Sequence, residues 1–498
     1  MSRSAHVARN VGWSLIGQVG IAVSSFVLTP RLVHGFGVEG YGLYVLMFAA
    51  VNYIQILTFG AGGATVRFAA ERRSAGDGKG VRDVLRYGAI LHVGGAMIGA
   101  AVLWFAAPWA ASSFFQIPPQ LFVPGVAILR AAAVGAVFYS GVQWVQACLQ
   151  GIQRFEWNSV SSMLQGILMP LGVAVLLANG KGLRAAGLWY VAVSALTFAV
   201  SLIVLWEAMP DEAHYQREEG LSFRKFSLYG LGMWLGPIAW IVGNQFDKVF
   251  IVRYLALSSL TVYAVPTGLL QRLQMVPASI SSVLFPVISE ARGEGVAEDL
   301  RRMYIRSTRM LLGIMAPVYL LMFSLMPQFL SLWLGGRFGI DGVWPARLLV
   351  AANAAGLLNF TANAVAAGRG KVWWLSAVAW GQAFGSLILW PLLIPRFGIL
   401  GAAMATLAAQ VLPDLVYLHR VNRLLDLPWK RFAPEALMPA LLAGAALLVV
   451  VFPLHHLVDG WVSFIVLSSL GGAIYAATLW LNLPHVDRHF ILRWAGRV

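Results

Sequence analysis

Apolar stretches of about twenty residues recur along the whole chain, and each is bounded by charged residues or by glycine and proline. A helix needs about 20 mostly apolar residues to cross the hydrocarbon core of a bilayer. The stretches are apolar on all sides, whereas the strands of a membrane barrel alternate apolar and polar residues. The pattern predicts an all-α polytopic membrane protein with about fourteen spans, near residues 10–31, 41–63, 87–111, 124–148, 159–178, 186–206, 228–252, 262–286, 308–334, 346–367, 373–395, 399–418, 435–454 and 460–482.

The composition supports this class. Of 498 residues, 59% are hydrophobic and 11% are charged, and the mean hydropathy is +0.73. An ordinary soluble protein carries roughly 25% charged residues, so a soluble enzyme is excluded. The single cysteine, Cys148, excludes an intrachain disulfide and a cysteine-based zinc site.

The positive charge predicts an orientation. The chain has 36 Lys and Arg against 21 Asp and Glu. If the N-terminus is inside, 26 of the 36 cations fall in inner segments, 7 at outer ends and 3 within spans. The positive-inside rule then places both termini in the cytoplasm. Because this charge is spread over many short loops, we expect no nucleic-acid partner.

An internal repeat predicts two matched halves. Residues 35–44 align with 254–263, residues 151–157 with 368–374, and Gly182 with Gly398, at a separation of 216 to 219 residues. Both halves begin on the same side, so the repeat is parallel and its pseudo-twofold axis lies along the membrane normal. We therefore expect an N-lobe of spans one to six (1–206), a cytoplasmic linker (207–227), a C-lobe of spans seven to twelve (228–420), and two extra C-terminal helices with a tail (421–498).

Four short motifs give the chain a family resemblance. They are GFGVEGYGLY at 35–44, GIQRFEWNS at 151–159, the stretch from Asn244-Gln-Phe-Asp-Lys to Ser281-Ser-Val-Leu-Phe-Pro, and FGILGAA at 397–403. With these motifs, residues 1 to about 420 resemble the Wzx-type polysaccharide and O-antigen flippases of the multidrug/oligosaccharidyl-lipid/polysaccharide exporter superfamily. The two extra C-terminal spans are similar to those of the related lipid II flippases, which have fourteen.

The resemblance implies two six-helix lobes around a central cavity. It also implies transport of an undecaprenyl-diphosphate-linked oligosaccharide across the bacterial cytoplasmic (inner) membrane by alternating access, for O-antigen, capsule or exopolysaccharide synthesis. Besides this cargo, the expected partners are membrane lipids and a polysaccharide polymerase with export machinery.

Ionisable residues within spans are the candidates for the transport path, because a charge at that depth is costly unless it meets a partner or water. An arginine binds phosphate oxygens bidentately, so the cations are expected to hold the diphosphate. The amides would bind sugar hydroxyls. The predicted substrate-binding set is Arg272, Arg130, Lys248, Arg31, Gln271, Gln274 and Asn244. Alternatively, Asp247 pairs with a cation on a neighbouring helix while Lys248 and Arg130 extend to the membrane surface. Asp414 is expected at the interface.

Neither Lys79 nor Lys371 lies in a phosphate-binding loop motif, so we expect a secondary transporter without cofactors and not an enzyme. The superfamily resemblance suggests H⁺ or Na⁺ coupling, with Asp247 as the ion-coupling acid, although span eleven offers Gln382 in place of an acid. A cation or drug antiporter of the same superfamily is the second hypothesis, against which the basic set of buried residues argues. A membrane glycosyltransferase or polymerase is the third, and it lacks the large outer loops it would need.

Overall fold

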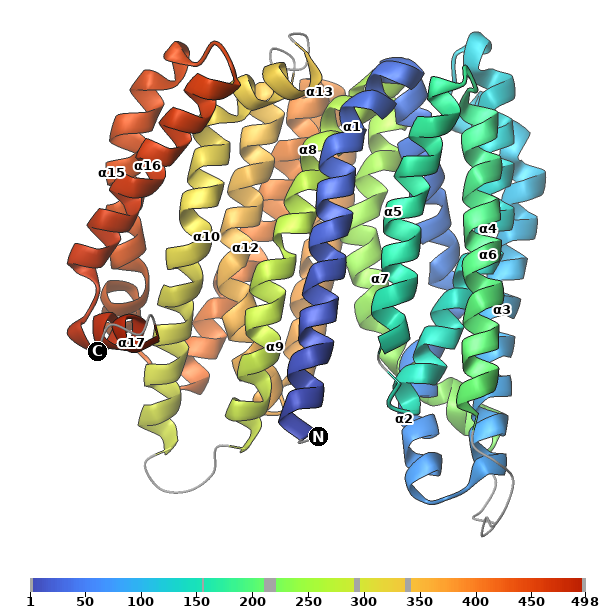
Figure 1. Cartoon of the computed structure of the whole chain (residues 1–498), viewed down its shortest axis with the longest axis horizontal. Coiled ribbons are helices and arrows are strands. Elements are labelled where there is room, and N and C mark those ends of the chain that lie inside the picture. The colour runs from blue at the N-terminus through green and yellow to red at the C-terminus, as the bar shows by residue number, and fades with distance from the viewer. Residues whose placement is uncertain (1–2, 155, 210–220, 291–295, 336–341, 495–498) are drawn as a thin grey trace. The chain divides into compact units, whose positions relative to one another are not determined.

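The computed structural model describes residues 3–154, 156–209, 221–290, 296–335 and 342–494. Within these ranges the chain is helical and contains no strand, which confirms the all-α class (Figure 1). The elements are α1 (Arg3–Gln55), η1 (Ile56–Thr58), α2 (Ala61–Ser74), α3 (Gly78–Trp109), η2 (Ala110–Phe114), α4 (Pro119–Gly151), α5 (Glu156–Ala178), α6 (Leu183–Ala208), α7 (Phe223–Tyr254), α8 (Leu257–Leu273), α9 (Met275–Glu290), α10 (Val296–Leu334), α12 (Val343–Gly368), α13 (Val372–Leu424), α14 (Trp429–Phe432), η3 (Ala433–Leu437), α15 (Met438–Leu454), η4 (His455–Leu457), α16 (Trp461–Asn482) and α17 (His485–Trp494).

Eleven helices in the described ranges are long and apolar enough to cross a membrane. Two of them, α1 and α13, have 53 residues each and contain a non-helical glycine, Gly37 or Gly398, with a φ of 71° or 60°. At 1.5 Å per residue a 53-residue helix would be about 80 Å long, so each turns back at its glycine and supplies two spans. The predicted eighth span is divided into α8 and α9. With these three additions, the described helices account for the fourteen predicted spans.

The contacts divide the chain into two compact units, residues 1–261 and 262–498. In the first unit α4 packs against α3 and α6, α1 packs against α4 and α5, and α2 packs against α7. In the second unit α12 packs against α9, α10 and α13, while α15 and α16 lie side by side against α10 (Figure 1). By its contacts α7 belongs to the first unit, whereas in the sequence repeat it is the first helix of the second half.

The ends of α4 and α12 show the repeat in backbone detail. Gln153 and Gly370 occupy equivalent positions after the two helices and have a φ of 62° and 73°. The next residue, Arg154 or Lys371, donates its backbone N–H to a carbonyl five residues back, at 2.7 and 2.8 Å. This is the Schellman pattern, in which a left-handed residue ends the helix and the last carbonyls are satisfied. The same cap at matched positions supports a duplication.

Both halves also interrupt a span at matched positions. The helical part of α1 ends at Gln55, and α8 ends one residue before Gln274, 219 positions later. In the first unit Phe59 and Gly60 adopt left-handed conformations. In the second unit Pro277 has no N–H to donate to the carbonyl oxygen of Leu273, the last residue of α8, so one intrahelical hydrogen bond is missing at the break.

An ionic contact attaches the C-terminal helix to the second unit. Asp487 of α17 is 2% exposed and pairs with Arg306 at 2.9 Å and with Arg309, both on α10. Arg309 also donates to the backbone carbonyl of Glu435. The contact thus joins α17, α10 and η3.

Replacing Gly60 by alanine is expected to lower the thermal stability of the protein. An L-residue in the left-handed region costs about 1–2 kcal/mol, and the added Cβ would lie 2.1 Å from the carbonyl oxygen of Gly230. The measurement is the midpoint of thermal unfolding in detergent. Gly232→Ala on α7 is the matched control, because no atom lies within 4 Å of its Cβ position. Equal midpoints for the two variants would contradict the close packing of the break.

Candidate functional site

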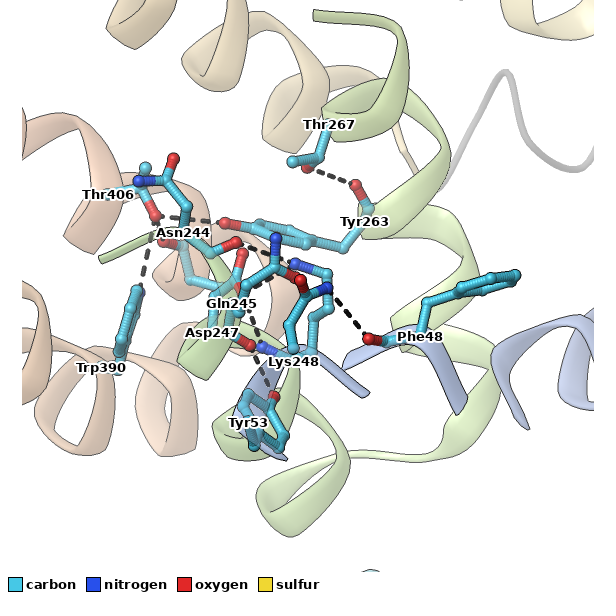
Figure 2. Close-up of polar contacts among 12 residues, drawn as sticks. Phe48, Tyr53, Asn244, Gln245, Asp247, Lys248, Tyr263, Thr267, Trp390 and Thr406 are labelled. Carbon is cyan, nitrogen blue, oxygen red and sulfur yellow. Dashed lines mark hydrogen bonds and ion pairs between the residues drawn. The ribbon is translucent and has the colours of Figure 1, made fainter. Parts of the chain in front are cut away.

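The predicted residues of α7 form a buried polar network with the end of α1 (Figure 2). Lys248 donates its Nζ to Asp247 Oδ1 at 3.2 Å and to the carbonyl oxygen of Asn244 at 3.0 Å. Asp247 is 4% exposed and Lys248 7% exposed. The hydroxyl of Tyr53 on α1 donates to the carbonyl oxygen of Gln245 at 2.7 Å. The bond from Tyr53 fixes α1 against the part of α7 that carries the ion pair.

The charges of Asp247 and Lys248 neutralise each other. Asp247 also accepts the backbone N–H of Lys248 at 2.8 Å, so both donors come from the next residue. The cation that pairs with Asp247 is therefore Lys248 of α7 itself, and not a cation on a neighbouring helix as in the alternative. A net neutral pair is a weaker anion site than an isolated lysine, and a weaker cation site than an isolated carboxylate.

A second network lies in the second unit and was not foreseen from the sequence (Figure 2). The hydroxyls of Tyr263 on α8 and Thr406 on α13 are 3.1 Å apart, and Trp390 donates its indole N–H to Thr406 at 3.5 Å. Tyr263 and Trp390 are fully buried. The network joins α8 to both legs of the α13 hairpin. Single hydroxyl and indole groups within apolar stretches gave no signal that could have predicted it.

The interruption between α8 and α9 gathers three of the predicted residues. Gln271, Arg272 and Gln274 are half-buried there. Arg272 donates from Nη1 to the carbonyl oxygen of Gly268 at 3.2 Å, and Gln274 donates from Nε2 to Asn353 Oδ1 on α12 at 2.6 Å. Interrupted helices within a membrane occur where backbone groups are buried in protein or line a polar path. An arginine at such a point can meet an anion with both its side chain and nearby backbone groups.

Each of the two interruptions is bound to a neighbouring helix through a glutamine side chain. In the first unit Ser140 of α4 donates to Gln55 Oε1 at 3.0 Å. In the second unit Gln274 donates to Asn353 of α12, which is the helix equivalent to α4. Each glutamine is therefore bound to the fourth helix of its own half, although only Gln274 was among the predicted residues.

The other two predicted cations lie elsewhere in the first unit. The Arg130 guanidinium on α4 lies over the ring of Trp104 on α3, 5.1 Å from its centroid. Arg31 is exposed on α1, six residues before the turn at Gly37. Among the contacts of the described residues, none joins either arginine to the α7 network. The predicted set is therefore distributed over several positions.

Asp414 is buried within the protein, and its expected depth near the membrane interface stays a prediction. Asp414 is 6% exposed and lies inside the second unit. Gln382, on the other leg of α13, donates to its Oδ1 at 2.5 Å. Sequence position indicates only how far Asp414 lies from the end of its span, whereas its burial depends on how the α13 hairpin packs against α12.

A family model described as "Polysaccharide biosynthesis protein" matches residues 7–292, which is more than half of the chain. The chain belongs to this family. The relatives of this polysaccharide biosynthesis protein include "Probable flippase AglR" of Haloferax volcanii, 23% identical over 92% of each chain. They also include "Succinoglycan biosynthesis transport protein ExoT" of Rhizobium meliloti, 24% identical over 96% of this chain and 93% of that protein.

The fold of this family member is similar to solved transporters. It matches a structure titled "Lipid II flippase MurJ, inward closed conformation" with a TM-score of 0.71 and 13% identity, over 95% of this chain and 99% of that one. An inward-facing MATE family multidrug transporter of the MOP superfamily matches with a TM-score of 0.61 and 15% identity, over 82% and 98%. These likenesses establish a MurJ- and MATE-like fold for a multi-pass membrane protein.

Removing one partner of the α7 ion pair is expected to destabilise the protein more than removing both. Asp247→Asn leaves the buried ammonium of Lys248 without a carboxylate, which typically costs about 3–5 kcal/mol. Asp247→Asn with Lys248→Met removes both charges and is expected to recover most of that loss. Thermal unfolding in detergent measures both variants. Equal losses in the single and double variants would show that pairing is not the main constraint on these side chains.

Proposed function

We propose that this protein is a flippase that moves an undecaprenyl-diphosphate-linked oligosaccharide across the bacterial cytoplasmic membrane by alternating access of its two six-helix lobes. The observation that carries the proposal is the position of Arg272, which lies next to Gln271 and two residues before Gln274 at the interruption of a membrane span. The family match supports the same function, as do the two relatives, one named a probable flippase and the other a succinoglycan biosynthesis transport protein.

The chemistry of the cargo suits this position. A lipid-linked diphosphate carries about two negative charges, and a guanidinium forms paired hydrogen bonds with phosphate oxygens. We assign Arg272 the main role because Lys248 is neutralised by Asp247 and Arg130 stacks on Trp104. Gln271, Gln274 and Asn244 would contact sugar hydroxyls, and Arg31 would meet the anionic headgroup nearer the membrane surface.

We further propose that both termini lie in the cytoplasm. The support is the excess of cations in the segments assigned to that side, 26 of 36, which is the usual determinant of orientation. Cargo would then enter from the inner leaflet, where its sugars are assembled, and leave to the outer leaflet. A polysaccharide polymerase and export machinery would consume it there.

The membrane potential can contribute to the work. Moving two negative charges outward through an inside-negative potential releases about 2.3 kcal/mol per charge per 100 mV, roughly 5 in total. We therefore propose a secondary transporter without a bound cofactor, to which H⁺ or Na⁺ coupling could add a further driving force.

A cation or drug antiporter is the competing function, and it predicts a different interior. A cavity that binds cations should be acidic, whereas Arg272 lies at the interrupted span and Asp247 is already neutralised by Lys248. Drug resistance conferred by the expressed protein, without any effect on polysaccharide export, would favour the antiporter. Elongation of a lipid-linked sugar by purified protein would favour the membrane glycosyltransferase or polymerase.

Arg272→Ala is expected to abolish polysaccharide export in a host whose own copy of the gene is deleted, while protein levels in the membrane remain normal. The reason is the loss of the guanidinium that meets the diphosphate. Arg272→Lys should retain part of the activity, because it keeps the charge but loses the bidentate geometry. Surface polysaccharide and membrane protein are measured in the same cells.

The matched control for this substitution is Arg253→Ala, which removes an exposed arginine in the last turn of α7 and should leave export unchanged. Full export by Arg272→Ala would remove Arg272 from the transport path.

A further inference from the structure

The second unit contains a buried carboxylate that neither the comparisons nor the predicted site assigns. Asp414 and Gln382 each lie 16 residues from the turn at Gly398, on opposite legs of α13. The hairpin therefore brings them to the same depth, where Gln382 donates to Asp414 Oδ1 at 2.5 Å. The other carboxylate oxygen, Oδ2, is buried and has no hydrogen-bond partner among the described residues.

Asp414 differs from the other buried acids in having no cation beside it. Among the described residues, four carboxylates are less than 9% exposed: Asp77, Asp247, Asp414 and Asp487. Asp77 pairs with Arg72 at 3.0 Å, Asp247 with Lys248, and Asp487 with two arginines of α10. The structure therefore neutralises three of these buried acids with basic side chains and leaves the fourth without one.

The groups around Asp414 are neutral. The side-chain amide of Asn359 on α12 lies close enough to interact with the Asp414 carboxylate. The Oδ1 atom of Asn359 is also buried and has no hydrogen-bond partner among the described residues. Tyr417 lies one turn along α13, close enough to interact electrostatically with Asp414, and donates to Asn363 Oδ1 of α12 at 2.8 Å. We call Asp414, Gln382, Asn359 and Tyr417 the Asp414 cluster.

The neighbouring helix α10 adds no free charge to the Asp414 cluster. Its titratable side chain in the same hydrophobic core is Tyr304, which is 2% exposed and interacts with Tyr417. The basic residue on that part of α10, Arg301, donates to the carbonyl oxygen of Leu425 and pairs with Glu298. Arg302 also pairs with Glu298, and Arg306 and Arg309 pair with Asp487, so these four arginines of α10 are engaged away from Asp414.

The duplication indicates that the fold does not require this acid. In the first half the positions equivalent to Gln382 and Asp414 are Gln165 and Phe198. Gln165 Nε2 is buried without a partner among the described residues, as expected when a phenylalanine replaces the carboxylate. The same kind of helical hairpin therefore forms with an apolar residue at this position, so the hairpin itself does not require the acid.

We propose that Asp414 binds and releases a proton during the transport cycle, a step that rests on the proposed function. The proton would form an O–H bond at Oδ2, which has no partner, and would return to water when the cluster opens. Rotation of the Asn359 amide would present Oδ1 to accept that O–H. A proton fits better than a metal ion, because Gln382 offers an N–H donor to the carboxylate, whereas a cation such as Na⁺ requires several oxygen ligands.

The proposal is tested first by infrared spectroscopy of purified protein between acid and alkaline pH. Subtracting the spectra of Asp414→Asn from those of the wild type isolates the carboxyl group of residue 414. We expect one protonated-carboxyl band that disappears as the pH rises, is lost in Asp414→Asn, and persists in Asp247→Asn. Asparagine at position 414 can still accept the hydrogen bond from Gln382, so the variant keeps this contact. Gln382→Leu should shift the pH at which the band disappears without abolishing the band.

Three outcomes of this titration would overturn the proposal. They are identical spectra for Asp414→Asn and the wild type, loss of the band in Asp247→Asn instead, and a band that responds to NaCl but not to pH. None of them depends on transport, so they leave the proposed function intact.

Transport is then measured in vesicles with a fluorescent undecaprenyl-diphosphate oligosaccharide. The wild-type rate should change with an imposed pH difference, and the rate of Asp414→Asn should not. A wild-type rate that is independent of pH would overturn coupling at Asp414. No transport at all by wild-type protein would instead overturn the proposed function, while the infrared result would still stand.

Discussion

The structure depends on one constraint: a polar group within the membrane needs a partner supplied by the protein, because lipid offers none. The interruption after α1 shows how strictly this holds. Ending the helix at Gln55 frees carbonyl oxygens, and these are met by side chains. Thr58 donates to the carbonyl of Gln55 at 2.9 Å, and Trp234 of α7 donates to that of Ile56 at 2.6 Å. The protein therefore supplies hydrogen-bond donors for the carbonyl oxygens that the interruption leaves without a helical partner.

The two halves of the duplication carry different polar groups at equivalent positions. The two halves share helix ends, turns and interrupted spans, yet equivalent positions carry different side chains. Arg272 occupies the position of Tyr53, and Asp414 occupies that of Phe198. Tyr53 in the first half bonds to a backbone carbonyl within its unit. The shared fold thus accommodates an uncharged residue at each of these positions in the first half and a charged one in the second.

Hydrophobic runs predicted the fourteen spans, because length and composition alone decide whether a helix can cross a bilayer. The runs missed polar helix ends, such as the first turns of α10, where Glu298 pairs with Arg431 at 2.5 Å. They could not predict the pairing of Asp247 with Lys248, since neighbouring residues on a helix point apart and only the bent lysine stem joins them. Nor could they place Asp414, because its burial depends on packing against another helix.

The two interrupted spans differ in how tightly they are held. In the first unit, added Cβ atoms at Gly60 and Gly95 would lie 2.1 and 1.9 Å from backbone carbonyl oxygens, so three helices meet there at backbone distance. In the second unit the break is held by side-chain hydrogen bonds, from Gln274 to Asn353 at 2.6 Å and from Ser281 of α9 to the carbonyl oxygen of Phe360 at 2.7 Å, and the first two residues of α9 are exposed. Backbone packing resists displacement more than side-chain hydrogen bonds do, each of which contributes about 1 kcal/mol. The break that carries Arg272 is therefore the one better able to adjust its geometry around a ligand.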